Sequence, residues 1–316
     1  MIEVENLTKK YGKKIAVDNV SFKINPGEIV GFLGRNGAGK TTTMNMITGY
    51  ISMTNGNIKV DGYDVFRHPL EVKKRIGYMP EQPPLYMDMT VADYLLFAAK
   101  IKGVVRSKRY DHVEDVAKTV GVFTVMDRVI GNLSKGYKQR VGLSQAMIGN
   151  PPVLILDEPT VGLDPKQIIS IRKLIKTLGK KRTLIISSHI LSEVAEVCDR
   201  VIVINNGKLV AQDTIASLTK MGTATKMSLR VMGPEKPTQR ALKEINGIKS
   251  VESLGVREAD SVDFLIETTG AFDVRSSIFN TLAKLSAPIL QLKPLDATLE
   301  DIFMHLTDDN FSKEEE

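Results

Sequence analysis

Tryptophan is absent from the chain, and cysteine occurs once, at Cys198. A single cysteine excludes an internal disulfide and is typical of a protein from a reducing compartment. Because Cys198 ends an apolar-periodic stretch that starts at Leu191, we expect a packed core thiol rather than a nucleophile. Apolar runs are also short, and none approaches the roughly twenty residues that a membrane-spanning helix needs. Any role at a membrane is therefore expected to depend on a partner.

The first ten residues, MIEVENLTKK, alternate like a strand and lack the basic start and apolar core of a signal peptide. We therefore do not expect secretion. The net charge of +6 is modest for 316 residues. It fits an anionic membrane surface or nucleic acid, but lysines on solvated helix faces explain it more simply. The charged fraction of 25% is typical of a soluble globular protein, and the length predicts two domains.

The first part of the chain has the pattern of an α/β domain. Short alternating segments over 2–24 predict antiparallel strands that are closed by the Pro26-Gly27 turn. Apart from its first residue, the run 28–33 is apolar, which suits a strand buried on both faces. A glycine-rich loop and a helix follow it. Two further short strands are expected, at 57–60 and 76–79.

From Thr90 onward the pattern becomes helical, because Thr90 and Asp93 form a capping-box-like start and apolar residues recur at helical spacing. We expect a helical insert over about 88–150. Strand-like runs then return as VLILD, TLIIS and RVIVIN, separated by amphipathic helices such as 166–178. This alternation predicts a parallel sheet covered by helices. The first domain is expected to span 1–220.

A second, smaller domain is expected over 225–308, after the small and polar linker 221–226. Its segments alternate as strand, helix, two strands, helix and strand, and a final helix, LEDIFMHL, follows. A split βαββαβ unit of ferredoxin-like α+β type is the economical interpretation. It contains no constellation of catalytic side chains. The acidic tail 309–316 is expected to be disordered.

A phosphate-binding loop is predicted between the buried strand and the helix, because GRNGAGKTT fits the pattern GxxxxGK[ST]. Its residues are Gly34, Arg35, Asn36, Gly37, Ala38, Gly39, Lys40, Thr41 and Thr42. Glycines let successive amide groups converge on the β-phosphate, and the helix adds its positive end. In this pattern Lys40 bridges the β- and γ-phosphates and Thr41 binds Mg²⁺. Glycine-rich turns before helices are common, but the preceding buried strand supports the functional interpretation.

Two acids follow the apolar strand in VLILDEP, at the carboxyl edge where α/β sheets bind ligands. We expect Asp157 to face Mg²⁺ and Glu158 to polarise the attacking water. An apolar strand that ends in two acids is often only a strand meeting a helix cap. Combined with the phosphate loop, it predicts a nucleoside triphosphatase.

Between these two elements stands LSKGYKQR, residues 133–140, which resembles the LSGGQ signature of ABC ATPases. The other landmarks of that family occur in order: Tyr11 before the loop, VGLD ending at Asp164 after the acids, and His189 after TLIIS. The resemblance covers roughly residues 1–215. It implies a head-to-tail dimer in which each ATP lies between one phosphate loop and the partner's signature.

The resemblance also implies roles for single residues. Ser134 and Gly136 contact the γ-phosphate in trans, Tyr11 stacks on adenine, and Asp164 belongs to the nucleotide site. His189 contacts the γ-phosphate and senses its loss. In MPEQPPLY, a gapless alignment places Glu81 at the family's coupling glutamine, with Gln82 beside it; either one could supply the metal contact. The departures from the signature, Lys135 and Tyr137, bear on its geometry and on the rate of hydrolysis.

The sequence thus predicts an ATP- and Mg²⁺-dependent ATPase. The ending TLEDIFMHLT resembles the C-terminal extension of export ATPases for drug resistance, sodium efflux and gliding motility. We therefore expect the ATPase subunit of an exporter at the cytoplasmic face of the membrane. Its expected partners are transmembrane permease subunits and a second ATPase subunit, as a homodimer, with no specific nucleic acid. The alternatives are a soluble ABC ATPase acting on ribosomes or nucleic acid, and a regulatory module with low turnover.

Overall fold

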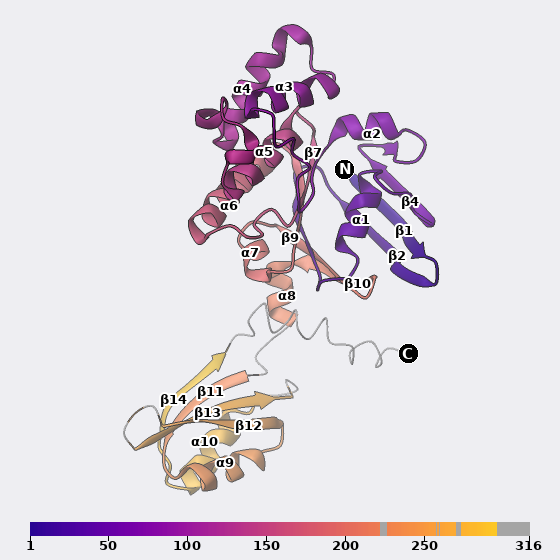
Figure 1. Cartoon of the computed structure of the whole chain (residues 1–316). Helices are drawn as coiled ribbons and strands as arrows, with labels where there is room; N and C mark the ends of the chain where they lie inside the picture. The colour runs from indigo at the N-terminus through magenta and orange to yellow at the C-terminus, as the bar shows by residue number, and fades with distance from the viewer. Residues whose placement is uncertain (222–225, 257, 259, 270–272, 296–316) are drawn as a thin grey trace. The chain divides into compact units, whose positions relative to one another are not determined.

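The computed structural model describes residues 1–221, 226–256, 258, 260–269 and 273–295. They fall into two compact units that divide between Ile215 and Ala216, each with its own core. Figure 1 shows both units. No helix in the described residues is long and apolar enough to span a bilayer.

A six-stranded sheet forms the centre of the first unit, in the order β10-β9-β3-β8-β7-β6. Its strands are β3 (Ile29–Leu33), β6 (Ile76–Met79), β7 (Val153–Asp157), β8 (Thr183–Ser188), β9 (Arg200–Asn205) and β10 (Lys208–Thr214). All pairs are parallel except β9 and β10. Every residue of β3, β7 and β8 is buried, as continuous apolar runs require. The expected parallel sheet is confirmed.

A second, antiparallel sheet pairs β2-β1-β4-β5. Its strands are β1 (Ile2–Tyr11), β2 (Lys14–Ile24), β4 (Asn55–Val60) and β5 (Tyr63–Asp64). Helix α1 (Lys40–Ile47) follows β3 and buries Met44, Met46 and Ile47 in a core shared by both sheets. Figure 1 shows α1 beside β1, β2 and β4. This packing fixes the helix that starts at the glycine-rich loop.

The expected helical insert consists of α3 (Val91–Ile101), α4 (Arg109–Val120) and α5 (Lys135–Met147), with short 3₁₀ turns between them. The Thr90 hydroxyl accepts a hydrogen bond from the Asp93 amide, so the predicted cap is present. The other helices of this unit are α2 (Pro69–Arg75), α6 (Pro165–Gly179) and α7 (Leu191–Ala195). In Figure 1, α3 to α6 lie on the side of β7 away from α1. A further helix, α8 (Ile215–Met221), begins at the boundary of the two units.

The second unit is an antiparallel sheet in the order β12-β13-β11-β14, with two helices. Its elements are β11 (Lys226–Met232), α9 (Glu235–Lys243), β12 (Ile248–Gly255), β13 (Ser261–Thr268), α10 (Arg275–Lys284) and β14 (Ile289–Leu295). Alternate residues of β11 are buried with Leu242, Ile278 and Leu282 of the helices. The expected βαββαβ unit is confirmed. The expected final helix and acidic tail, and most of the linker, lie outside the described residues.

Candidate nucleotide-binding site

The glycine-rich loop connects β3 to α1 at the carboxyl edge of the parallel sheet. Gly37 and Gly39 have φ of 82° and 108°, a region that favours glycine. A Cβ on Gly39 would also lie 2.6 Å from the Ala16 carbonyl oxygen. The loop therefore needs glycine for its backbone conformation and for its close packing. Its amide groups precede a helix N-terminus, which is the arrangement that binds phosphate.

Lys40 is buried at the first position of α1. Its Nζ donates a hydrogen bond of 2.8 Å to the Gly34 carbonyl oxygen and lies 3.8 Å from Glu158 Oε1. A buried ammonium group is retained only when such partners offset its lost hydration. Lys40 thus holds a positive charge inside the loop, next to the Glu158 carboxylate.

Asp157 ends β7 and is fully buried. Its Oδ1 accepts a hydrogen bond from the Ser187 hydroxyl. Its Oδ2 is buried and has no hydrogen-bond partner among the described residues. Because a buried carboxylate oxygen without a partner is costly, this atom fits a cation or its bound water.

Glu158 follows Asp157 and has a left-handed backbone, with φ of 48°. Such a conformation costs of order 1 to 3 kcal/mol in a residue other than glycine and is common at functional sites. The Glu158 amide is held by the Ser187 hydroxyl at 3.0 Å and by the Ser187 carbonyl oxygen at 3.2 Å. The strained backbone turns the side chain of Glu158 toward Lys40 and His189.

The Glu158 carboxylate lies between two basic side chains. Its Oε2 is 3.0 Å from His189 Nδ1, and its Oε1 faces Lys40. Burial raises the pKa of the Glu158 carboxyl group; the hydrogen bond and charge of His189 and the charge of Lys40 oppose this rise, and Asp157 adds to it. A carboxylate with raised proton affinity, oriented by two partners, suits the general base of hydrolysis. The His189 side chain is 44% exposed, so its ring can also reach a ligand.

The donor set at this edge fits Mg²⁺. Thr41 is exposed in the first turn of α1, and Asp157 Oδ2 is available at the end of β7. Magnesium is usually held by one or two protein oxygens together with water and substrate phosphates. No cluster of three or more metal-binding side chains occurs in the described residues.

Tyr11 ends β1 and has an exposed ring, with Lys9 Nζ 5.0 Å from the ring centroid. Glu81 and Gln82 follow β6 and are both exposed, outside any helix or strand. Because β6 pairs with β7, with Met79 opposite Leu156, these two residues leave the sheet at the same edge as Asp157. The structure therefore leaves both of them open as the coupling residue.

The signature residues occupy the start of α5. The Ser134 hydroxyl caps this helix by accepting a hydrogen bond of 3.4 Å from the Tyr137 amide. A Cβ on Gly136 would lie 2.0 Å from Gln167 Oε1, and the Gln167 amide donates to Asp164 Oδ1 at 2.9 Å. Asp164 therefore caps α6 directly beside the signature of the same chain.

The Lys135 side chain lies against the VGLD segment, because a Cβ added to Gly162 would be 1.9 Å from Lys135 Nζ. No hydrogen bond or ion pair in the described part of the chain joins Tyr11, Ser134 or Gly136 to Lys40. The structure thus brings together Lys40, Asp157, Glu158 and His189, while the signature residues lie on other elements.

Ser187 is a site residue to which the sequence analysis assigned no role. It bonds both Asp157 and Glu158, and its own position is set by the register of β7 and β8, in which Asp157 pairs with Ser187. The signal in the sequence is the pair of serines that ends the apolar run TLIISS. Hydroxyl side chains at a strand end beside paired acids are candidates for orienting them.

Together, the loop around Lys40, the acids at the end of β7 and the parallel sheet define a P-loop nucleoside triphosphatase with a helical insert and an antiparallel sheet. Residues 17–161 match the family model described as ABC transporter. The chain belongs to the ABC transporter family as an ATP-binding subunit, and it is an ATPase.

Similar proteins cover from about two thirds to nearly all of the chain. The bacitracin transport ATP-binding protein BcrA of Bacillus licheniformis is 42% identical over 70% of this chain and 72% of its own. The linearmycin resistance ATP-binding protein LnrL of Bacillus subtilis (strain 168) is 33% identical over 97% of this chain and 98% of its own. The dimeric structure of MJ0796, a bacterial ABC transporter cassette, is 25% identical with a TM-score of 0.63, over 68% of this chain and 99% of that one.

Proposed function

We propose that this chain is the ATP-hydrolysing subunit of a membrane exporter, which it powers as a head-to-tail dimer around ATP. The observation that carries the proposal is the Glu158 carboxylate held between Lys40 and His189 at the carboxyl edge of the sheet. The direction of transport rests on the relatives, which include a bacitracin transport protein and a linearmycin resistance protein. Both names concern an antibiotic.

The phosphate loop binds the triphosphate of ATP. Amide groups of residues 34–39 point toward the β-phosphate, and the Lys40 ammonium exchanges its bond with the Gly34 carbonyl oxygen for β- and γ-phosphate oxygens. Thr41 and Asp157 would hold Mg²⁺, directly or through water, and the ion would neutralise charge on those phosphates. The exposed ring of Tyr11 stacks on adenine.

Hydrolysis uses Glu158 as the general base and His189 as its orienting partner. The carboxylate accepts a proton from the attacking water while His189 fixes its second oxygen and contacts the γ-phosphate. Ser134 and Gly136 of a second copy supply a hydroxyl, amide groups and a helix N-terminus from the other side of the nucleotide. The dimeric cassette among the solved structures supports this arrangement.

An exposed aromatic cluster supports docking of a membrane partner. The Tyr86 ring packs edge-on against Tyr94 and Phe97, with ring centroids 5.9 Å and 5.8 Å apart. Tyr86 and Phe97 remain exposed, and the cluster follows the Pro83-Pro84 segment that starts beside the nucleotide edge. Contact with a permease subunit at this cluster would link nucleotide closure to transport at the cytoplasmic face of the membrane.

The test is recovery of the chain with membranes when it is co-expressed with a multi-spanning membrane protein encoded beside it. We expect the chain in the membrane fraction only when that protein is present. Tyr86→Asp and Phe97→Asp should lower the recovery, whereas Phe66→Asp, at an exposed ring elsewhere in the first unit, should not. Recovery on ribosomes, or equal recovery with and without the membrane protein, would contradict the exporter role.

A further inference from the structure

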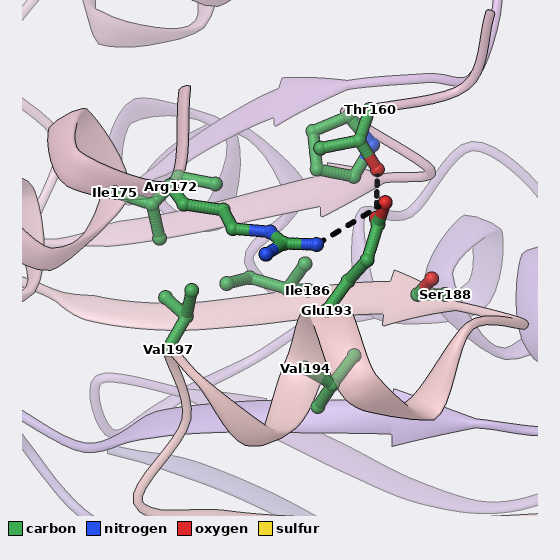
Figure 2. Close-up of a pocket in the computed structure, with 9 residues that line it drawn as sticks. Thr160, Arg172, Ile175, Ile186, Ser188, Glu193, Val194 and Val197 are labelled. Atoms are coloured by element: carbon green, nitrogen blue, oxygen red, sulfur yellow. Dashed lines mark hydrogen bonds and ion pairs between the residues drawn. The ribbon is translucent and has the colours of Figure 1, made fainter. Parts of the chain in front are cut away.

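Two buried side chains, Thr160 and Glu193, and the half-buried Arg172 form a polar cluster outside the nucleotide site, named here the Glu193 cluster. The Thr160 hydroxyl donates a hydrogen bond to Glu193 Oε2, and Arg172 Nη2 lies 3.4 Å from Glu193 Oε1. Figure 2 shows both interactions, with Glu193 between the other two side chains. The Glu193 residue is 9% exposed, so its charge is largely removed from water.

The surroundings of this carboxylate are mostly apolar. Ile175, Ile186, Val194 and Val197 line the same small pocket as the Glu193 cluster. A charged group is retained in such surroundings only when its hydrogen-bonding partners are fixed. Arg172 also reaches the surface, where its Nη1 lies 2.8 Å from Glu196 Oε2. The inner pair with Glu193 is therefore distinguishable by experiment from the outer pair with Glu196.

Each member of the cluster comes from a different element. Thr160 lies two residues after Glu158, Arg172 is in α6, and Glu193 is in α7, four residues after His189. Glu158 and His189 themselves touch at 3.0 Å. These links form a closed ring. The backbone joins Glu158 to Thr160, and Thr160 bonds Glu193. The start of α7 joins Glu193 back to His189, which contacts Glu158. This ring offers a path by which a shift of Thr160 relative to α7 reaches the Glu158–His189 contact.

We propose that Glu193 is a positioning residue for hydrolysis: it holds Thr160 against α7 and thereby keeps the Glu158 carboxylate and the His189 ring in mutual register. Glu193 does not touch the nucleotide in this account. The proposal rests on the proposed roles of Glu158 and His189. The strained backbone of Glu158 makes such support necessary, because a residue held at positive φ reverts unless its neighbours fix it.

The test measures kcat and KM for ATP in purified full-length variants. Thr160→Val removes the hydroxyl while keeping the shape and the Arg172 pair, and Glu193→Met removes the accepting oxygens while keeping a side chain of similar length. We expect each to lower kcat by about 10- to 100-fold, the effect of small misplacement of catalytic groups, with little change in KM. Thr160→Ser, which retains the hydroxyl, should restore kcat. Because both substitutions break the same contact, between Thr160 and Glu193, the double variant should be no slower than the slower single variant.

Glu196→Gln is the matched control, since it breaks the outer pair of Arg172 at a side chain that is 63% exposed. Its kcat should stay within about twofold of that of the unchanged chain. A Thr160→Val protein with unchanged kcat would overturn the proposal. So would a loss of kcat that Thr160→Ser fails to restore, because the effect would then not depend on the hydroxyl.

Two reference variants separate this inference from the function on which it rests. Glu158→Gln and His189→Ala should each reduce kcat strongly. If they do while the Glu193 and Thr160 variants remain fully active, the positioning role alone is wrong. If Glu158→Gln and His189→Ala leave kcat unchanged, the proposed hydrolytic site itself is wrong. Thermal unfolding of each variant, measured in parallel, identifies any change that acts by unfolding the first unit.

Discussion

Asp157 and Ser187 are register partners at the ends of β7 and β8, and the Ser187 hydroxyl donates a hydrogen bond to Asp157 Oδ1. The same hydroxyl accepts a hydrogen bond from the Glu158 amide. One buried serine thus orients the acid that would face the metal and the backbone of the acid that activates water. Its removal is expected to affect both.

Ser187→Ala should lower ATP turnover by about tenfold or more and destabilise the first unit. The substitution leaves Asp157 Oδ1 buried without its donor, which costs about 1 to 3 kcal/mol. Steady-state ATPase assays and chemical denaturation measure the two effects. Ser170→Ala, at an exposed serine that accepts a hydrogen bond from Arg140, is the control and should show neither. Full turnover in Ser187→Ala would remove Ser187 from the site.

Glu158→Gln should raise the free energy of unfolding of the nucleotide-free chain at neutral pH. Burial raises the pKa of Glu158, so the folded state binds this proton more tightly than the unfolded state does. The stability that this difference contributes is fully present at pH values below the pKa of Glu158 in the unfolded chain. It is lost as pH rises through the higher pKa of Glu158 in the folded chain. The gain in Glu158→Gln should therefore grow as pH rises across that window and then level off.

Melting temperatures of both proteins between acid and neutral pH measure this difference. A Glu158→Gln protein that is less stable than the unchanged chain at neutral pH would mean that Lys40 and His189 outweigh the cost of burial.

Tyr11→Ala should weaken ATP binding by about 2- to 10-fold, because an aromatic stacking contact contributes about 0.5 to 1.5 kcal/mol. Tyr11→Phe retains the ring and should bind like the unchanged chain. The comparison is made by calorimetric titration with ATP. Equal affinity in all three proteins would show that adenine stacks elsewhere.

Phe264→Ala should destabilise the second unit by about 3 to 5 kcal/mol while leaving ATP affinity intact. Phe264 is fully buried in the core of that unit, so its truncation leaves a cavity there. Scanning calorimetry should show one transition that shifts to lower temperature and one that stays. Phe279→Ala, at an exposed position of α10, is the control. A parallel shift of both transitions would contradict independent folding.

Local patterns predicted most of the fold because each strand and helix carries its own signal. The run ending in Asp157 had to be a buried strand, and Thr90 with Asp93 marked a helix start that the structure confirms. The phosphate loop was predictable for the same reason, since its glycines, Lys40 and Thr41 are contiguous.

Contacts between distant segments were not predictable from such patterns. Ser187 reaches Asp157 only because β8 pairs with β7 in one register, and Glu193 reaches Thr160 only because α7 packs beside the turn after Glu158. Tyr11, Ser134 and His189 were found through family resemblance, because a lone tyrosine, serine or histidine carries no spacing signal. The left-handed backbone of Glu158 likewise has no mark in the sequence.

In the proposed mechanism, the loop around Lys40 binds the phosphates of ATP together with Mg²⁺. Calorimetric titration of ATP into the unchanged chain and into Lys40→Met, each with Mg²⁺ and with a chelator, tests it most directly. We expect binding that depends on Mg²⁺ in the unchanged chain and an affinity at least about tenfold lower in Lys40→Met, since bonds to charged groups contribute about 1.5 to 3 kcal/mol. Equal affinity in the two proteins, or no binding by the unchanged chain, would contradict the account.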